Sequence, residues 1–212
     1  MKSKFLAEFF GTALLLAVVT GSGIMGDQLS AGNAAVALLA NSIATGCGLY
    51  VLITVLGPIS GAHFNPAVSL MFWRNDAIES KTLSSFLVAQ FSGGIAGVWL
   101  THFIFGIQVL QTSTKPRTGP GIWLSEFIST LLLLSVIHLG IKYANEKVAL
   151  LVAMTVTAGY WFTSSTFFAN PAVTLARSLT NTFVGIAPAD VAGFIFAQLA
   201  AVSLIFILMK KL

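Results

Sequence analysis

The chain has 212 residues, of which 56% are hydrophobic and only 8% are charged, and its mean hydropathy is +0.90. A soluble domain usually has about a quarter of its residues charged, so this composition excludes an ordinary water-soluble globule. The hydrophobic residues lie in long blocks, which indicates membrane spans. The single cysteine, Cys47, excludes an intramolecular disulfide, and the net charge of +4 forms no patch typical of nucleic-acid binding.

The hydrophobic blocks predict six membrane-spanning helices. The first block follows Lys2 and Lys4 but is not followed by a convincing cleavage site of small residues, so we interpret it as a retained span and not as a signal peptide. The clearest loop in the chain covers residues 108–120, which contain two prolines and a glycine. The predicted spans cover residues 5–25, 33–56, 83–107, 121–141, 148–166 and 189–209.

Two short segments between these spans predict half-helices that begin inside the membrane. Asn is a strong N-cap and Pro is favoured in the first helical turn. A half-helix of about nine residues is too short to cross ~30 Å of hydrocarbon. Non-helical backbone at that depth is tolerated only where it is buried in protein or lines a wet cavity, so the two segments predict a pore. Both contain the tripeptide Asn-Pro-Ala, as Asn65, Pro66 and Ala67 and as Asn170, Pro171 and Ala172.

The two halves of the chain resemble each other, which predicts an internal repeat. AEFFGTALLL at residues 7–16 matches SEFISTLLLL at 125–134, and both halves carry an Ala-Gln pair in their last span. Because each half has three spans, the second half must insert upside down, which places the two half-helix N-termini face to face. The predicted fold is an all-α membrane domain over residues 1–212, with a first repeat over 1–107 and an inverted second repeat over 121–212.

The positions of lysine and arginine predict that both termini are cytoplasmic. Positive charge is enriched in the cytoplasmic segments of membrane proteins. With both termini inside, the inner side carries eight of the eleven basic residues, Lys2, Lys4, Arg74, Lys81, Lys142, Lys147, Lys210 and Lys211. The outer side then carries Lys115, Arg117 and Arg177.

Several polar residues in apolar surroundings are candidates for function. Asn65 and Asn170 would present amide donors to solutes with oxygen lone pairs, and two positive helix ends would repel cations. Glu8 and Glu126 lie inside spans, where they act either as proton-coupling groups or as acceptors for the backbone of the half-helix loops; their symmetric placement favours the second role. His63 either lines the inner vestibule or bonds to nearby backbone. With no nucleophile–base pair or metal-ligand spacing visible, we expect neither an enzyme nor a cofactor or metal site.

The spans, the repeats and the two Asn-Pro-Ala copies resemble the aquaporin (major intrinsic protein) family over essentially the whole chain, and SGAHFNPAV at residues 60–68 is the most specific likeness. The resemblance implies a passive channel for small uncharged solutes, assembled as a homotetramer in the inner membrane of a bacterium. In that family, residues at set distances from the two asparagines form a second constriction, the selectivity filter. The implied filter residues are Thr45, Ala158, Phe167 and Val173.

The implied filter departs from the family pattern. Most members have arginine where this chain has Val173, and water-selective members have larger residues where Thr45 and Ala158 stand, so the resemblance implies a wider and less polar filter. Arg177 lies one turn beyond Val173 and either supplies a vestibule charge or extends to the membrane interface. The sequence NPAVTLAR is similar to a bacterial branch associated with arsenic-resistance genes. That likeness implies water, glycerol-like polyols and arsenous acid or methylated arsenicals as solutes.

Three other functions remain open. A water-selective aquaporin would share every motif named above. An ion-coupled secondary transporter can also use inverted repeats and broken helices, with Glu8 and Glu126 as its candidate ion sites. A junction or scaffold protein would have the same fold without conduction.

Overall fold

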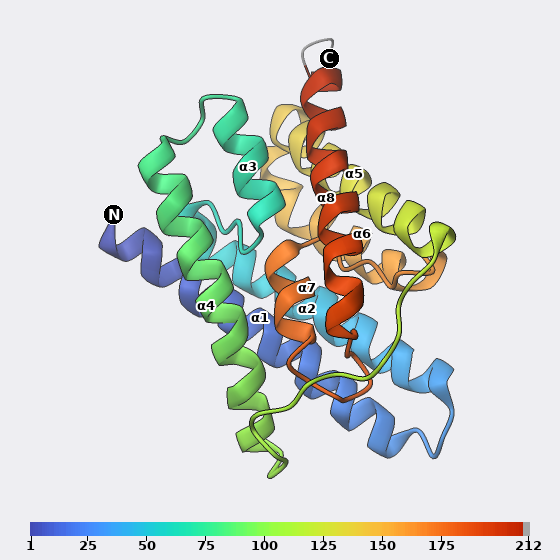
Figure 1. Cartoon of the computed structure of the whole chain (residues 1–212). Coiled ribbons are helices and arrows are strands. Elements are labelled where there is room, and N and C mark those ends of the chain that lie inside the picture. The colour runs from blue at the N-terminus through green and yellow to red at the C-terminus, as the bar shows by residue number, and fades with distance from the viewer. Residues whose placement is uncertain (210–212) are drawn as a thin grey trace.

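The computed structural model describes residues 1–209, and these form helices joined by turns and loops (Figure 1). Lys210 and Lys211, which we predict on the inner side, lie outside the described residues. The long helices are α1 (Lys2–Leu29), α2 (Ala34–Ser60), α4 (Ser80–Ile104), α5 (Pro120–Tyr143), α6 (Val148–Phe162) and α8 (Pro188–Met209). Two short helices, α3 (Pro66–Arg74) and α7 (Pro171–Arg177), and a 3-10 turn, η1 (Asn145–Lys147), complete the set.

Five of these helices, α1, α2, α4, α5 and α8, are long and apolar enough to cross a membrane. The sixth, α6, has 15 residues, which is about 22 Å at 1.5 Å per residue and shorter than the hydrocarbon core. We predicted this span to reach residue 166, but the helix ends at Phe162. Hydroxyl residues follow it, and such side chains compete for backbone hydrogen bonds: the Thr163 hydroxyl donates to the carbonyl of Gly159 at 2.6 Å.

The second span is longer than predicted, because α2 continues through Pro58 to Ser60. Proline removes one backbone donor but fits the helical φ, so a helix can pass through it near its end. The helix stops at Gly61, whose φ of +93° is typical of a left-handed C-cap.

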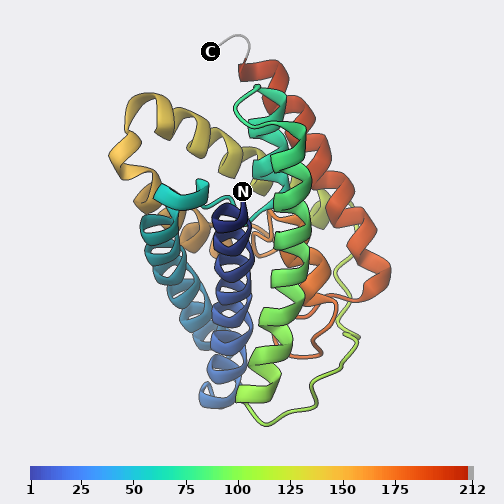
Figure 2. The same cartoon turned by 90° about the vertical axis from the view of Figure 1, so that its left-hand side faces the viewer.

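The helices pack in two sets that have the same order of elements. Helix α1 packs on α2 and α4, and α5 packs on α6 and α8, while both half-helices, α3 and α7, lie against α4 and α8 (Figures 1 and 2). In both views the start of α1 and the end of α8 lie in the upper half, and the turn after α4 lies at the bottom. The half-helices therefore fill the middle of a bundle of longer helices.

The contact between α1 and α4 is unusually close because glycine lies on the α4 side. A β-carbon at Gly97 would lie 2.1 Å from the carbonyl oxygen of Ala13, and one at Gly93 would lie 2.3 Å from that of Phe9. Small residues at helix crossings allow such backbone contact in membranes, where dispersion replaces the hydrophobic effect as the driving force.

The distribution of side chains is the reverse of that in a soluble protein. Large apolar residues such as Phe103, Val88 and Phe196 are exposed, whereas Glu8 and Glu126 are fully buried. An apolar outer surface around a polar interior is stable in lipid. The predicted all-α membrane fold is confirmed, and the chain is a multi-pass membrane protein.

Candidate functional site

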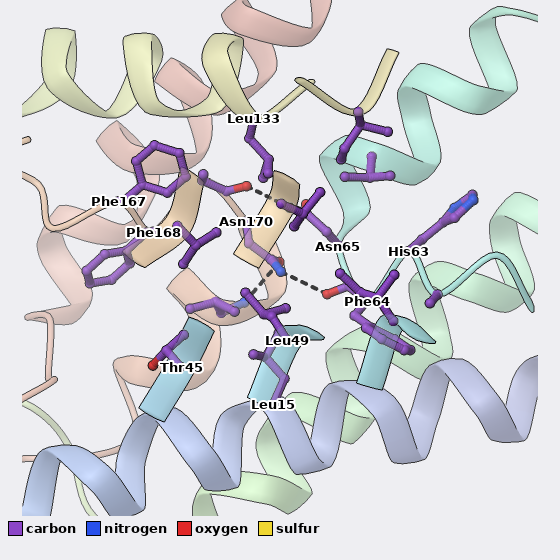
Figure 3. Close-up of a pocket in the computed structure, with 18 of the residues that line it drawn as sticks. Leu15, Thr45, Leu49, His63, Phe64, Asn65, Leu133, Phe167, Phe168 and Asn170 are labelled. Carbon is purple, nitrogen blue, oxygen red and sulfur yellow. Dashed lines mark hydrogen bonds between the residues drawn. The ribbon is translucent and has the colours of Figure 1, made fainter. Parts of the chain in front are cut away.

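The N-termini of the two half-helices meet at the centre of the bundle, where Asn65 and Asn170 exchange hydrogen bonds with the opposite loop. The Asn65 amide donates to the carbonyl of Ala169 at 2.7 Å, and the Asn170 amide donates to that of Phe64 at 2.8 Å (Figure 3). Each asparagine oxygen also caps its own half-helix, accepting from the residue two positions on at 2.9 Å. An amide NH2 has two hydrogens, so one donor of each asparagine is bound and one is left.

The loops that lead into the half-helices have a backbone that L-residues rarely adopt. The φ angles are positive at Ala62 and Phe64 and, at the equivalent places before the second asparagine, at Phe167 and Ala169. Each such residue costs roughly 1–2 kcal/mol, because its β-carbon crowds the next carbonyl. The loops need support from elsewhere in the fold to hold this shape.

Glu8 of α1 supplies that support for the first loop. Its carboxylate accepts the backbone N–H groups of His63 at 2.9 Å and Phe64 at 2.7 Å. It also accepts from the Ser60 hydroxyl at 2.7 Å and from the Gln90 amide at 2.8 Å. Four donors around one fully buried carboxylate replace the water it has lost.

Glu126 of α5 holds the second loop through one carboxylate oxygen, Oε1. Its carboxylate accepts the backbone N–H of Ala169 and, at 2.7 Å, the amide of Gln198. The Gln198 amide also donates to Thr174 at 2.8 Å, as the Gln90 amide does to Ser69 at 2.9 Å. The two glutamines are part of the site that sequence reasoning missed, although the repeated Ala-Gln pair was visible.

A cavity of about 120 Å³ runs past the two asparagines. Aliphatic side chains such as Leu15, Leu49 and Leu133 make up much of its wall. Figure 3 shows Thr45, Phe167 and Phe168 toward one end, His63 toward the other, and the asparagine pair between them. A mostly apolar passage with a few donors at its middle is suited to small neutral molecules.

At the end of the cavity near Thr45, one of the predicted filter residues does not line the wall and another residue takes its place. Thr45, Phe167 and Val173 line the cavity as expected, but Ala158 does not and lies on the exposed face of α6. Tyr160 lines it instead, with its hydroxyl 3.2 Å from that of Thr45. The prediction was wrong because it assumed an ungapped spacing, and a shift of two residues turns a helix by about 200°.

Of the two roles that the sequence left open for His63, the structure shows the one in the cavity wall, and the hydrogen bond of its ring goes to a side chain and not to backbone. It lines the cavity, and its Nδ1 lies 3.0 Å from the Ser69 hydroxyl. Its ring packs 4.5 Å from the Phe72 ring and 5.2 Å from the Phe86 ring, measured between centroids.

Arg177 lies inside the protein and does not extend to the membrane interface. It is 2% exposed, lines the cavity and donates from Nε to the carbonyl of Val184. Its guanidinium carbon lies 3.5 Å from the centroid of the Phe168 ring. The interface alternative is therefore wrong, because the 178–187 loop supplies an acceptor inside the bundle.

Arg117 is a second arginine at the same end, and sequence reasoning did not single it out. Its Nε donates to the carbonyl of Gly185 at 2.8 Å, and its guanidinium carbon lies 5.2 Å from the centroid of the Phe168 ring. Burial lowers the pKa of the Arg117 guanidinium, an effect opposed by Tyr160 and Glu126, and the group stays charged at neutral pH. One of two basic residues in a Pro/Gly loop, as Arg117 is, carries no local signal of this placement.

Known proteins resemble this chain in sequence and in fold. The model of the major intrinsic protein family matches residues 1–156, which include the first Asn-Pro-Ala copy. The chain is 52% identical over 196 residues to aquaglyceroporin AqpS of Rhizobium meliloti (strain 1021), covering 92% of this chain and 84% of that protein. It is 35% identical over 100 residues to the glycerol uptake facilitator protein of Pseudomonas aeruginosa, covering 47% of this chain and 35% of that protein.

A solved structure has the same fold. The X-ray structure of the aquaglyceroporin from Plasmodium falciparum superposes with a TM-score of 0.71 at 19% sequence identity, covering 100% of this chain and 99% of that one. The chain therefore belongs to the major intrinsic protein family, a family of membrane channels.

Proposed function

We propose that this chain is a passive channel for small uncharged solutes: water, glycerol-like polyols and uncharged metalloid acids such as arsenous acid. The observation that carries the proposal is the asparagine pair at the middle of the cavity, with one N–H of Asn65 and one of Asn170 left to bind a passing solute. The high identity to a protein named an aquaglyceroporin supports solutes larger than water.

The mechanism needs no energy source. A solute leaves water, accepts hydrogen bonds from the free asparagine N–H groups and slides along apolar walls that include Phe167. A cation would meet the positive ends of α3 and α7. Glu8 accepts four donors, and Glu126 accepts two at Oε1. Both carboxylates therefore help to hold the half-helix loops, which speaks against an ion-coupled transporter.

We assign selectivity to the constriction formed by Thr45, Tyr160, Phe167 and Val173. Val173 places an isopropyl group where most members have a guanidinium, so this level of the pore has more room and fewer donors. The Thr45 and Tyr160 hydroxyls offer a polar edge opposite this apolar surface.

The test is stopped-flow light scattering on proteoliposomes with water, glycerol and arsenous acid. Val173→Arg adds bulk and charge, and Val173→Leu is the matched control that adds bulk alone. We expect wild type to pass the larger solutes, Val173→Leu to slow them and Val173→Arg to abolish them while water still passes. If wild type passes water alone, the protein is a water-selective aquaporin. Flux that follows a proton or sodium gradient would indicate an ion-coupled transporter, and absence of any flux would indicate a scaffold protein.

We also propose that the chain lies in the inner membrane of a bacterium as a homotetramer with both termini in the cytoplasm, and that residues 121–212 are an inverted copy of 1–107. Maleimide labelling of Lys81→Cys and Lys115→Cys, each with Cys47→Ser, tests the orientation. An impermeant reagent added outside should label the second variant alone. Native mass spectrometry tests the tetramer.

A further inference from the structure

Two guanidinium groups converge on one aromatic ring at the Thr45 end of the cavity. The Phe168 ring lies 3.5 Å from the guanidinium carbon of Arg177 and 5.2 Å from that of Arg117. Arg177 comes from the last turn of α7, whereas Arg117 comes from the segment between α4 and α5. The electron-rich face of an aromatic ring attracts such cations, so Phe168 helps to hold both.

The hydrogen bonds of both guanidinium groups are made to neutral oxygens. Arg177 donates to the carbonyl of Val184, and Arg117 donates to the neighbouring carbonyl of Gly185 and to the Thr166 hydroxyl, at 2.8 and 3.4 Å. Neutral acceptors orient a guanidinium without cancelling its charge. The carboxylate of Asp190 accepts the backbone N–H of Arg117 at 2.7 Å and so fixes the segment that carries the side chain.

These charges lie at a different level of the pore from Val173. Arg177 comes four positions after Val173 in the helix, which places it on the same face about 6 Å farther along the axis. The constriction beside Val173 can therefore be wide and uncharged, while the next level toward the mouth holds the buried charge of Arg177, with the half-exposed guanidinium of Arg117 beside the same Phe168 ring. A buried charge such as that of Arg177 is weakly screened and acts strongly on a passing ion.

We propose that Arg117 and Arg177 form a charge filter, separate from the size filter at Val173, that keeps cations and protons out of a pore wide enough for polyols. The inference rests on the proposed channel function. The charge is also needed here because the negative end of α7 faces this mouth and would otherwise attract cations. Neutral solutes with oxygen acceptors pass, since the arginine N–H groups can donate to them.

The experiment measures proton leak and glycerol flux in the same proteoliposomes, made with the full chain and loaded with a pH-sensitive dye. A potassium gradient with valinomycin drives the protons. The variants are Arg117→Leu/Arg177→Leu, the charge-preserving Arg117→Lys/Arg177→Lys, and Lys115→Leu as a control that removes an exposed charge from the same segment. We expect wild type, the lysine variant and Lys115→Leu to leak within about twofold of protein-free vesicles, and the double leucine variant to leak at least about tenfold more.

The outcomes separate the two proposals. A double leucine variant that passes glycerol but is as proton-tight as wild type overturns the charge filter and leaves the channel standing. A lysine variant that leaks like the leucine variant overturns it as well, because position and not charge would then matter. Absence of glycerol flux in wild type overturns both proposals.

If the double leucine variant does not fold, Arg117→Gln provides the test, because it changes only a half-exposed loop side chain. That variant should leak at least about threefold more than wild type, since one of the two charges is gone. An unchanged leak with normal glycerol flux overturns the proposal.

Discussion

Glu8 and Phe64 are 56 residues apart in sequence, yet the Glu8 carboxylate accepts the backbone N–H of Phe64 at 2.7 Å. Phe64 has a φ of +47° and presents its carbonyl to Asn170. The carboxylate in α1 thus fixes the residue that positions the opposite asparagine. Glu126 and Ala169 repeat the relationship in the second half, with the Ala169 carbonyl facing Asn65.

Replacing Glu8 should disrupt folding and not only transport. In Glu8→Gln, one acceptor becomes an NH2 group that faces other donors, and a buried donor left without a partner costs about 1–3 kcal/mol. We expect a lower thermal unfolding temperature in detergent and loss of all solute flux together. A variant that keeps its unfolding temperature but loses flux would favour the proton-coupling role instead.

Asn65→Asp should damage the pore while keeping the helix cap. Aspartate caps as well as asparagine, but its carboxylate has no N–H for the Ala169 carbonyl and would face that oxygen at close range. Asn33→Asp is the matched control, because Asn33 caps α2 on the surface with its side-chain oxygen alone. Glycerol flux and thermal stability should fall in the first variant and stay unchanged in the second; equal behaviour would contradict the cross-loop bond.

Gly97→Ala should loosen the crossing of α1 and α4. The added β-carbon would lie 2.1 Å from the Ala13 carbonyl oxygen, and overpacking of this kind typically costs about 1–3 kcal/mol. Gly121→Ala meets nothing within 4 Å in the first turn of α5, so it should be neutral or stabilising by up to about 1 kcal/mol. Unfolding of the two variants in the same detergent compares them directly, and similar losses would mean that the close approach is not required.

Transport measurements can check that Tyr160, and not Ala158, belongs to the constriction. Tyr160→Phe removes a hydroxyl that contacts Thr45 and lines the cavity, and the loss of one hydrogen bond worth about 0.5–1.5 kcal/mol should slow glycerol by about two- to tenfold. Ala158→Leu adds bulk on the exposed face of α6 and should leave flux unchanged. Blocked flux in Ala158→Leu with normal flux in Tyr160→Phe would restore the original assignment.

The sequence by itself determined the helices, the half-helices and their meeting point. Those features depend on local chemistry: apolar blocks match the thickness of a bilayer, and each Asn-Pro pair starts a helix where it stands. The repeated motifs then required that Asn65 and Asn170 face each other, as they do.

Only the tertiary structure decided which side chains complete the mouth. Arg117 reaches Phe168 from a loop whose path depends on contacts with residues 178–190. Arg177 turns inward because the segment at 178–190 offers it the carbonyl of Val184. Tyr160 lines the cavity where the sequence predicts Ala158, because α6 ends at Phe162 and the segment between this helix and Asn170 is longer than predicted. Loops and helix ends are set by long-range packing, so their register cannot be counted along the chain.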